Sequence, residues 1–248
     1  MKLTSTLIFC ATALLSGCSP YYYSPNKVNI PNLRERNDMR LDAGFGGGWI
    51  MKGADLQAAY AITSHVGIMA NGALTGSRES STNFSEREYT KSRYLEAGLG
   101  YFTKFEENQN WALEIFGGGG MGDYKVRYDP EKLARLNMNK FFIQPSLSYS
   151  LPRKNIEFGI GSKFSGVDYN LKSATILDTY DFERVARIVN RSLVVFWEPS
   201  FRFSAGSETI KGFLSYTPSI SILESNIPRE IINLNLGIRF TFNTSRRQ

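Results

Sequence analysis

Hydrophobic and polar residues alternate strictly near the C-terminal end of the chain, between Arg229 and Phe242. Every second position from Ile232 to Phe242 is Ile, Leu or Phe, and the positions between them are polar or small. Because successive side chains of a strand point to opposite faces, one face of this segment is apolar and the other is polar. The segment is therefore predicted to be the closing strand of a β-barrel.

The same two-phase pattern recurs about ten times from Asp38 onward. Barrels of this size are routinely a single domain, so the 248 residues are predicted to form one all-β, antiparallel, up-and-down barrel of about ten strands. The alternating segments are 39–49, 54–62, 66–75, 95–101, 111–120, 141–149, 156–163, 193–203, 210–220 and 232–242.

Three prolines fall inside the predicted strands. Pro145, Pro199 and Pro218 are each expected at a bulge or near a strand end, because proline has no N–H to donate.

The polar phase indicates which face of the barrel is which. It contains few long charged side chains and nine glycines, which suit a crowded lumen because glycine lets other groups approach the sheet closely. The apolar phase carries several large rings, which suit contact with lipid. A transmembrane barrel with its apolar phase outward is therefore expected. A periplasmic lipoprotein barrel that binds an apolar ligand in its interior is the alternative. The glycines are Gly44, Gly46, Gly48, Gly98, Gly100, Gly118, Gly120, Gly159 and Gly161.

The connections between the predicted strands alternate between short and long after the first hairpin. Short connections fall near 63–65, 104–110, 152–155 and 205–208, and longer ones near 78–91, 124–137, 170–191 and 223–228. Membrane barrels have short periplasmic turns and longer outer loops. An even strand count then places both termini on the periplasmic side. The apolar spacing within 177–189 predicts a short helix in one of the long loops.

The first residues are typical of an export signal. Lys2 precedes a short apolar stretch, Leu7 to Leu15, and Leu15-Ser16-Gly17-Cys18 follows. This last sequence resembles the bacterial lipobox, which implies a lipoprotein signal peptide over 1–17 and acylation of Cys18, for example with palmitate. The alternative is ordinary cleavage that leaves Cys18 as a free thiol.

Residues 18–37 are Tyr-, Pro- and Asn-rich and are predicted to be a lipidated tether that precedes the barrel domain, 38–248. Its Tyr21 to Tyr23 run lies either at the lipid headgroups or as a packed plug against the barrel rim. The acyl chains on Cys18 are expected in the inner leaflet of the outer membrane, where they give stable attachment.

Composition excludes several classes of function. The net charge of +6 is mild and spread along the chain, which disfavours nucleic-acid binding. No segment approaches the roughly 20 apolar residues that a spanning helix needs. Once the signal is removed and Cys18 is acylated, no thiol is left for a disulfide, for catalysis or for a metal site. The expected partners are outer-membrane lipid and small solutes or surface partners.

Signal, tether and a Gly- and aromatic-rich barrel with a Phe-containing last strand together resemble the small outer-membrane β-barrel proteins of Gram-negative bacteria, the porin-like and opacity-type families. The resemblance implies a lipid-anchored protein of the cell outer membrane, with a structural role or limited passage of small solutes. A surface protein acting through loops 78–91 and 170–191 is a further alternative. The chain departs from the family pattern because Asn243 to Gln248 follow Phe242, where the family ends on an aromatic residue.

Charged residues of the polar phase are the candidate site residues, as a lumen network. They form either a structural ion-pair network or a polar pathway with charge selectivity. His65, which is the only histidine, falls in a predicted turn, so neither catalysis nor a metal site is expected, and no cofactor is expected either. Gly117 to Gly120 lacks the ending of a phosphate loop and is interpreted as strand curvature. The network residues are Arg40, Asp42, Asp55, Glu96, Glu114, Glu157, Lys163, Glu198, Arg202, Lys211 and Arg239.

Overall fold

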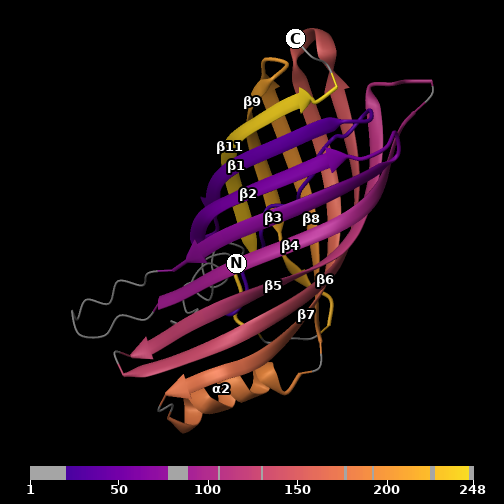
Figure 1. The fold of residues 1–248 in the computed structure, drawn as a ribbon. Coiled ribbons are helices and arrows are strands. Elements are labelled where there is room, and N and C mark those ends of the chain that lie inside the picture. Colours follow the sequence, from indigo (N-terminus) through magenta and orange to yellow (C-terminus); the bar gives the residue numbers. More distant parts are fainter. Residues whose placement is uncertain are drawn as a thin grey trace, which may run out of the picture.

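The computed structural model describes residues 21–77, 89–105, 107–129, 131–175, 178–191, 193–223 and 227–245. The predicted signal peptide and Cys18 lie outside these residues. The described chain forms one antiparallel sheet that curls round on itself (Figure 1). Its strands are β1 (Asp38–Gly47), β2 (Lys52–Ala61), β3 (Val66–Gly76), β4 (Tyr89–Lys104), β5 (Trp111–Asp129), β6 (Lys132–Leu151), β7 (Ile156–Thr175), β8 (Val194–Gly206), β9 (Ile210–Pro218), β10 (Ile220–Ser221) and β11 (Ile232–Asn243).

The sheet closes into a barrel of ten strands within the described part of the chain. Each strand from β1 to β9 pairs with its neighbour in sequence, and β11 pairs with both β9 and β1. The short β10 keeps the register of β9 against β8, since Phe201 lies opposite Tyr216 and Trp197 lies opposite Ile220. The predicted antiparallel up-and-down barrel is confirmed.

The prolines inside the strands behave differently from expectation. Pro145 and Pro199 lie within β6 and β8, and the register is unchanged on both sides of each. The ladder between β6 and β7 omits Gln144 and Pro145 and then resumes in the same register. The wall therefore accommodates the missing N–H without a bulge. Only Pro218, the last residue of β9, lies at a strand end as expected.

The two ends of the barrel carry different connections and are named here the turn end and the helix end. The turn end holds the connections near 62–65, 105–110, 152–155 and 207–209, a 3-10 turn at Pro152–Lys154 and both barrel termini, Asp38 and Asn243. The helix end holds the β5–β6 hairpin and helix α2 (Thr179–Val189) (Figure 1).

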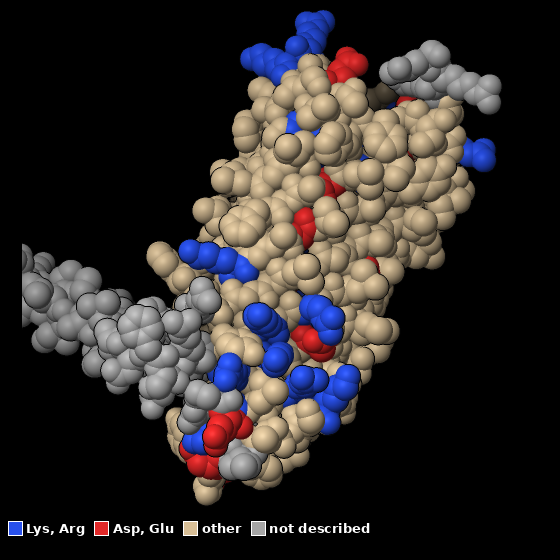
Figure 2. Space-filling view, turned by 60° about the vertical axis from the view of Figure 1, so that its left-hand side comes forward, with Lys and Arg blue, Asp and Glu red and all other residues tan. Residues whose placement is uncertain are grey.

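The apolar phase of the strands points away from the lumen. Leu56, Phe45 and Leu236 are 67%, 64% and 61% exposed, whereas Arg239, in the polar phase of β11, is 1% exposed. On the face seen in Figure 2, charged side chains are sparser in the middle of the barrel than at its lower end. An apolar band outside and polar groups inside are the architecture of a membrane barrel. The predicted assignment of the two faces is confirmed.

Strands β4 to β7 continue beyond this band at the helix end, and there the pattern inverts. Tyr124, Val126 and Leu136 point inward and are buried, while Lys125 and Arg135 face outward. Inward apolar side chains and outward charges are the pattern of a sheet whose outer face meets water. The extension therefore lies outside the lipid-facing band.

The sequence predicts a long loop over residues 124–137, and that prediction is wrong. These residues belong to β5 and β6, which are joined by residues 130–131. The alternation continues through this region, but its apolar phase changes from the outer face to the inner face. A pattern search that follows one phase alone therefore loses the strand at the inversion.

Helix α2 confirms the short helix predicted in the 170–191 region, although Leu177 lies outside the described residues. The carboxylate of Asp178 caps the helix by accepting the Asp181 N–H at 2.9 Å. This bond and the hydrogen bond from Lys132 lower the pKa of Asp178 below its usual value. Val185 and Ile188 pack into the inward apolar cluster of the extension. Among the described residues, no helix has both the length and the apolar character needed to cross a bilayer.

The N-terminal segment 21–37, named here the thread, runs through the lumen. Its first residues lie at the helix end, where the Tyr22 N–H donates to the Pro228 carbonyl at 2.9 Å and the Tyr169 hydroxyl donates to the Tyr22 carbonyl at 2.8 Å. Its last residues lie at the turn end, where the Thr244 N–H donates to the Asn37 carbonyl at 3.0 Å. The segment expected to be a tether before the barrel thus lies inside it.

This path also corrects the expectation that both termini lie on one side of the barrel, as far as residues 21–245 are concerned. An even strand count does place Asp38 and Asn243 together at the turn end. The thread, which precedes β1 in the chain, crosses the lumen from the helix end to the turn end. Tyr22 therefore lies at the opposite end of the barrel from Asn243. The strand count could not reveal this, because it ignores any chain that crosses the lumen before the first strand.

Candidate functional site in the barrel lumen

The lumen contains all of the charged residues that the sequence assigns to its polar phase. Each lies on the inner face of the wall and is at most 9% exposed. Burial of so many charges requires that they be paired or hydrogen-bonded, because an isolated buried charge is costly. They are Arg40, Asp42, Asp55, Glu96, Glu114, Glu157, Lys163, Glu198, Arg202, Lys211 and Arg239.

One group of ion pairs lies toward the turn end. Asp42 accepts from Arg202 at 2.7 Å and from Arg239 at 2.8 Å. Glu157 pairs with Arg239 at 3.3 Å and with Lys211 at 3.4 Å. Arg239 therefore bridges two carboxylates that come from β1 and β7, on different sides of the barrel. Such a bridge connects parts of the wall that no strand ladder joins directly.

A second group lies toward the helix end. The Lys163 ammonium contacts both carboxylate oxygens of Glu96, at 2.6 and 2.7 Å. Lys140 pairs with Glu198 at 3.4 Å and donates to the Tyr23 hydroxyl at 2.9 Å. Tyr23 in turn donates to Glu198 at 2.5 Å. The thread thus supplies a member of the network, and not merely bulk that fills the lumen.

The middle of the thread is held by side chains of several strands. The Lys27 ammonium pairs with Asp55 at 2.8 Å, and Gln57 donates to the Lys27 carbonyl at 2.6 Å. Gln144 donates to the Asn29 carbonyl at 2.5 Å from the opposite part of the wall. These contacts satisfy backbone groups that would otherwise be buried without partners. The wall therefore binds the backbone of the thread through side-chain amides, where a neighbouring strand would use its own backbone.

Glu114 binds the thread in a different way. Its carboxylate accepts the backbone N–H groups of Asn32 at 3.1 Å and Leu33 at 2.8 Å, and the Ser146 hydroxyl donates to it at 3.2 Å. Hydrogen bonds from backbone N–H groups to a carboxylate are stronger than those between neutral groups. Glu114 thereby fixes the point at which the thread approaches the turn end.

Glycines of the wall leave room for apolar side chains of the thread. A Cβ on Gly159 would lie 3.0 Å from Ile30 Cγ2, and one on Gly161 would lie 3.2 Å from both Ile30 Cδ1 and Val28 Cγ1. The crowded lumen predicted from the glycines is thus crowded in part by the thread. A cavity between Ile30, Arg202 and their neighbours has a volume of about 10 Å³, which is room for about one water molecule.

Sequence reasoning missed the contributions of Lys27 and Lys140. Lys140 lies just before the predicted strand 141–149 and in its inward phase, so a longer strand would have included it. Lys27 lies in a segment without periodicity, and no local signal places it opposite Asp55. Its position depends on the path of the thread, which only the three-dimensional structure defines.

His65 lies at the turn end, where its Nδ1 is 3.2 Å from the Phe102 carbonyl and its ring stacks on Tyr101. This is a packing role for the side chain. Within the described ranges, no group of three or more His, Cys, Asp or Glu residues is arranged to hold a metal ion.

Similarity to known proteins is found among solved structures. No protein-family model matches the chain, and no curated protein matches it. Among solved structures, the translocator domain of the autotransporter NalP from Neisseria meningitidis is similar over 82% of this chain and 86% of its own, with a TM-score of 0.41 and 11% identity. OmpT, an outer membrane protein of Vibrio cholerae, is similar over 83% of this chain and 96% of its own, with a TM-score of 0.30 and 8% identity.

Fold and lumen together define a class of protein: a closed membrane-type β-barrel that is filled by its own N-terminal segment. Both of these solved structures are outer-membrane barrels.

Proposed function

We propose that this chain is a lipid-anchored barrel of the Gram-negative outer membrane with a structural role. The barrel holds the thread across the membrane and keeps the lumen closed. The observation that carries this proposal is the continuous set of wall contacts along the thread, from Tyr22 at the helix end to Asn37 at the turn end.

The orientation in the membrane follows from the two ends of the barrel. Short turns face the periplasm in outer-membrane barrels, so the helix end faces outward. Cys18 precedes Tyr21 by three residues, a length of chain that spans at most about 11 Å. Under this proposal an acyl anchor on Cys18 lies near the outer leaflet, whereas the even strand count alone predicts the inner leaflet. Several acyl chains make such attachment stable.

Accessibility of the two chain ends tests this proposal. A short epitope inserted between Pro20 and Tyr21 is expected to bind antibody on intact cells, whereas the same epitope after Gln248 is expected to bind only after the outer membrane is permeabilised. Mass spectrometry of the N-terminal peptide, with Cys18→Ala as the control, tests the acyl anchor. A C-terminal epitope that is accessible on intact cells while the N-terminal one is hidden would contradict the proposed orientation.

Limited passage of small solutes is a second candidate function. The thread is held in the lumen by hydrogen bonds, ion pairs and packing, and its displacement breaks no covalent bond. The lumen that it would leave is lined by Asp42, Glu96, Glu157 and their cationic partners, which would give an ion pathway with charge selectivity. Under this proposal conductance depends on displacement of the thread.

The remaining alternatives receive less support. An apolar ligand in the interior would need an empty apolar chamber, but Tyr22, Tyr23 and Leu33 of the thread pack into the inward apolar clusters of the wall. Surface recognition through the outer connections stays a proposal, since residues 78–88 lie outside the described chain and α2 offers Tyr180 and Phe182 as exposed rings. A non-enzymatic role is part of the proposal.

A further inference from the structure

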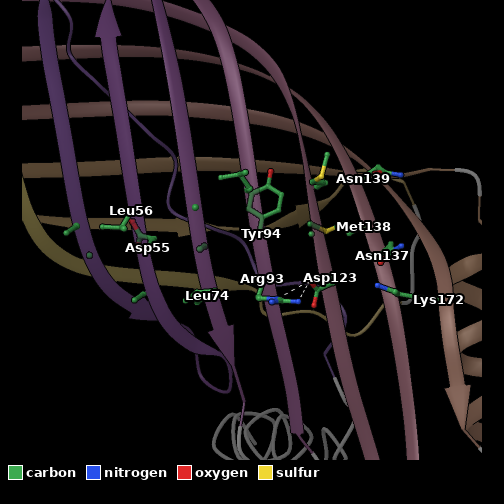
Figure 3. Close-up of a pocket in the computed structure, with 18 residues that line it drawn as sticks. Asp55, Leu56, Leu74, Arg93, Tyr94, Asp123, Asn137, Met138, Asn139 and Lys172 are labelled. Carbon is green, nitrogen blue, oxygen red and sulfur yellow. Dashed lines mark hydrogen bonds and ion pairs between the residues drawn. The ribbon is translucent and has the colours of Figure 1, made fainter.

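The outer wall of the barrel has a hollow where the lipid-facing band meets the inverted extension of β4 to β7. Two adjoining concavities of about 820 and 490 Å³ share Leu74, Arg93, Asp123, Asn137 and Lys172. Figure 3 shows these side chains on neighbouring strands. The hollow therefore lies at the level where a lipid changes from acyl chains to headgroup.

The part of the hollow on the lipid-facing band is apolar. Leu56, Leu95 and Met121 line it, and they are 67%, 61% and 68% exposed. Together these side chains form an apolar surface. Acyl chains can pack on it without displacing any hydrogen-bonding group from its partner.

The rest of the hollow is strongly basic. Six lysines and arginines line the two concavities, and the outward-facing acid among the lining residues is Asp123. Figure 2 shows the corresponding group of Lys and Arg side chains near the lower end of the barrel. Asp55 also lines the hollow, but its carboxylate is turned toward the lumen and is paired with Lys27. The six cations are Lys52, Lys91, Arg93, Lys125, Arg135 and Lys172.

Within the described residues, one ion pair neutralises part of this charge. Arg93 pairs with Asp123 at 3.0 Å, in a bridge that is largely exposed to solvent. The ammonium groups of Lys91 and Lys125 lie 5.4 and 5.8 Å from the centre of the same ring, that of Tyr89. The two ammonium groups repel each other because both lie over the same ring. A polyanion bound between them would reduce that repulsion.

We propose that this hollow is a binding site for a lipid that carries phosphate groups above several acyl chains. The phosphates accept hydrogen bonds from the basic side chains, and the acyl chains lie along Leu56, Leu95 and Met121. Arginine and lysine both bind phosphate, and arginine does so with two parallel hydrogen bonds. A zwitterionic headgroup fits less well, because its own ammonium would face the same cations. This inference rests on the proposed placement of the barrel in a membrane.

Retention of lipid by purified protein in neutral detergent tests the site without reference to membrane orientation. The probes are diphosphoryl lipid A, monophosphoryl lipid A and phosphatidylethanolamine, and native mass spectrometry gives their relative affinities. The expected order is diphosphoryl lipid A, then monophosphoryl lipid A, then phosphatidylethanolamine. Millimolar inorganic pyrophosphate is expected not to displace the bound lipid. Displacement by pyrophosphate would show a site for soluble phosphates and would overturn the proposal.

Charge removal locates the site. The triple variant Lys91→Gln/Lys125→Gln/Arg135→Gln is expected to bind diphosphoryl lipid A about a hundredfold more weakly, from three cations near the headgroup. The matched control Lys104→Gln/Arg153→Gln/Lys154→Gln removes the same charge near the turn end and is expected to bind as the unchanged protein does. Equal loss in both variants, or no loss in the first, would overturn the assignment. The epitope test above can fail while this test succeeds, so the two failures are distinguishable.

Discussion

Arg239 shows how single residues connect the wall to the thread. Its guanidinium donates to Asp42 and Glu157 of the wall and, at 2.6 Å, to the Ile30 carbonyl of the thread. The planar group with its five N–H donors suits this arrangement, since lysine could not reach all of these acceptors in fixed directions. The sequence shows that Arg239 points inward, but it does not show that one of its partners is the backbone of residue 30.

The Lys163–Glu96 pair gives a prediction about stability. Lys163→Met leaves the buried Glu96 carboxylate without its closest cation, which is expected to cost about 3–5 kcal/mol in the free energy of unfolding. The double variant Glu96→Gln/Lys163→Met removes the charge as well and is expected to recover much of that loss. Urea unfolding in detergent micelles measures both values. A single variant as stable as the double variant would contradict the assigned pairing.

The space at Gly161 gives a prediction about closure of the lumen. Gly161→Leu places a side chain where Ile30 and Val28 now pack, so it is expected to displace the thread and to produce conductance in a planar bilayer. Adding Ile30→Ala returns space and is expected to reduce that conductance. Gly212→Leu is the control, because a Cβ there has one contact, with the Ala205 carbonyl at 3.8 Å. Conductance that is equal in all three variants would argue against the thread as the plug.

At the scale of the elements, alternation predicts the strands well and their lengths poorly. β1, β8 and β11 are close to their predicted segments, because the alternating pattern covers nearly all of each. β5 to β7 are longer than predicted, because their apolar phase changes face where they leave the lipid-facing band. The inversion is visible in the sequence at Tyr124, Val126 and Lys125 once both phases are followed.

The lipid-facing band gives an element-scale prediction. Leu236→Arg places a charge on the outer face of β11 and is expected to destabilise the folded barrel by about 2–4 kcal/mol if it lies near the bilayer midplane. Asn137→Arg also faces outward, but it lies on the extension and is expected to change stability little. Reversible unfolding from phospholipid vesicles measures both. Equal costs for the two variants would contradict the boundary between band and extension.

The Asp178 cap makes the stability of α2 depend on pH. The pKa of Asp178 is lowered in the folded protein, so the cap contributes fully above the usual aspartate pKa and is lost as pH falls through the lowered value. Amide exchange over 179–189, corrected for intrinsic rates, is expected to accelerate in that acid range. Asp178→Asn still caps the helix without titrating at this position and is expected to show a flatter profile. Identical profiles would rule out Asp178 as the source.

At the scale of the whole molecule, the closed barrel and its outward apolar face follow from the sequence, while the thread does not. The thread is recognised by contacts between residues as far apart as Ile30 and Arg239, and it has no periodicity of its own. Its Tyr-, Pro- and Asn-rich composition is also that of a linker, so local sequence cannot distinguish the two. The inward charges were identifiable, but the assignment of partners required the path of the thread.

The central claim is that residues 21–37 occupy the lumen, and a disulfide tests it most directly. A Cβ on Gly159 would lie 3.0 Å from Ile30 Cγ2, so the Cβ atoms of two cysteines at these positions would be at most about 4.5 Å apart, within the range of a disulfide. In a Cys18→Ala background, Ile30→Cys/Gly159→Cys is expected to form this bond in cells, as seen by mass spectrometry of the linked peptides. Ile30→Cys/Gly212→Cys, with its second cysteine on the outer face, is expected to remain reduced. Absence of the 30–159 link in folded protein, or a link in both pairs, would contradict the account.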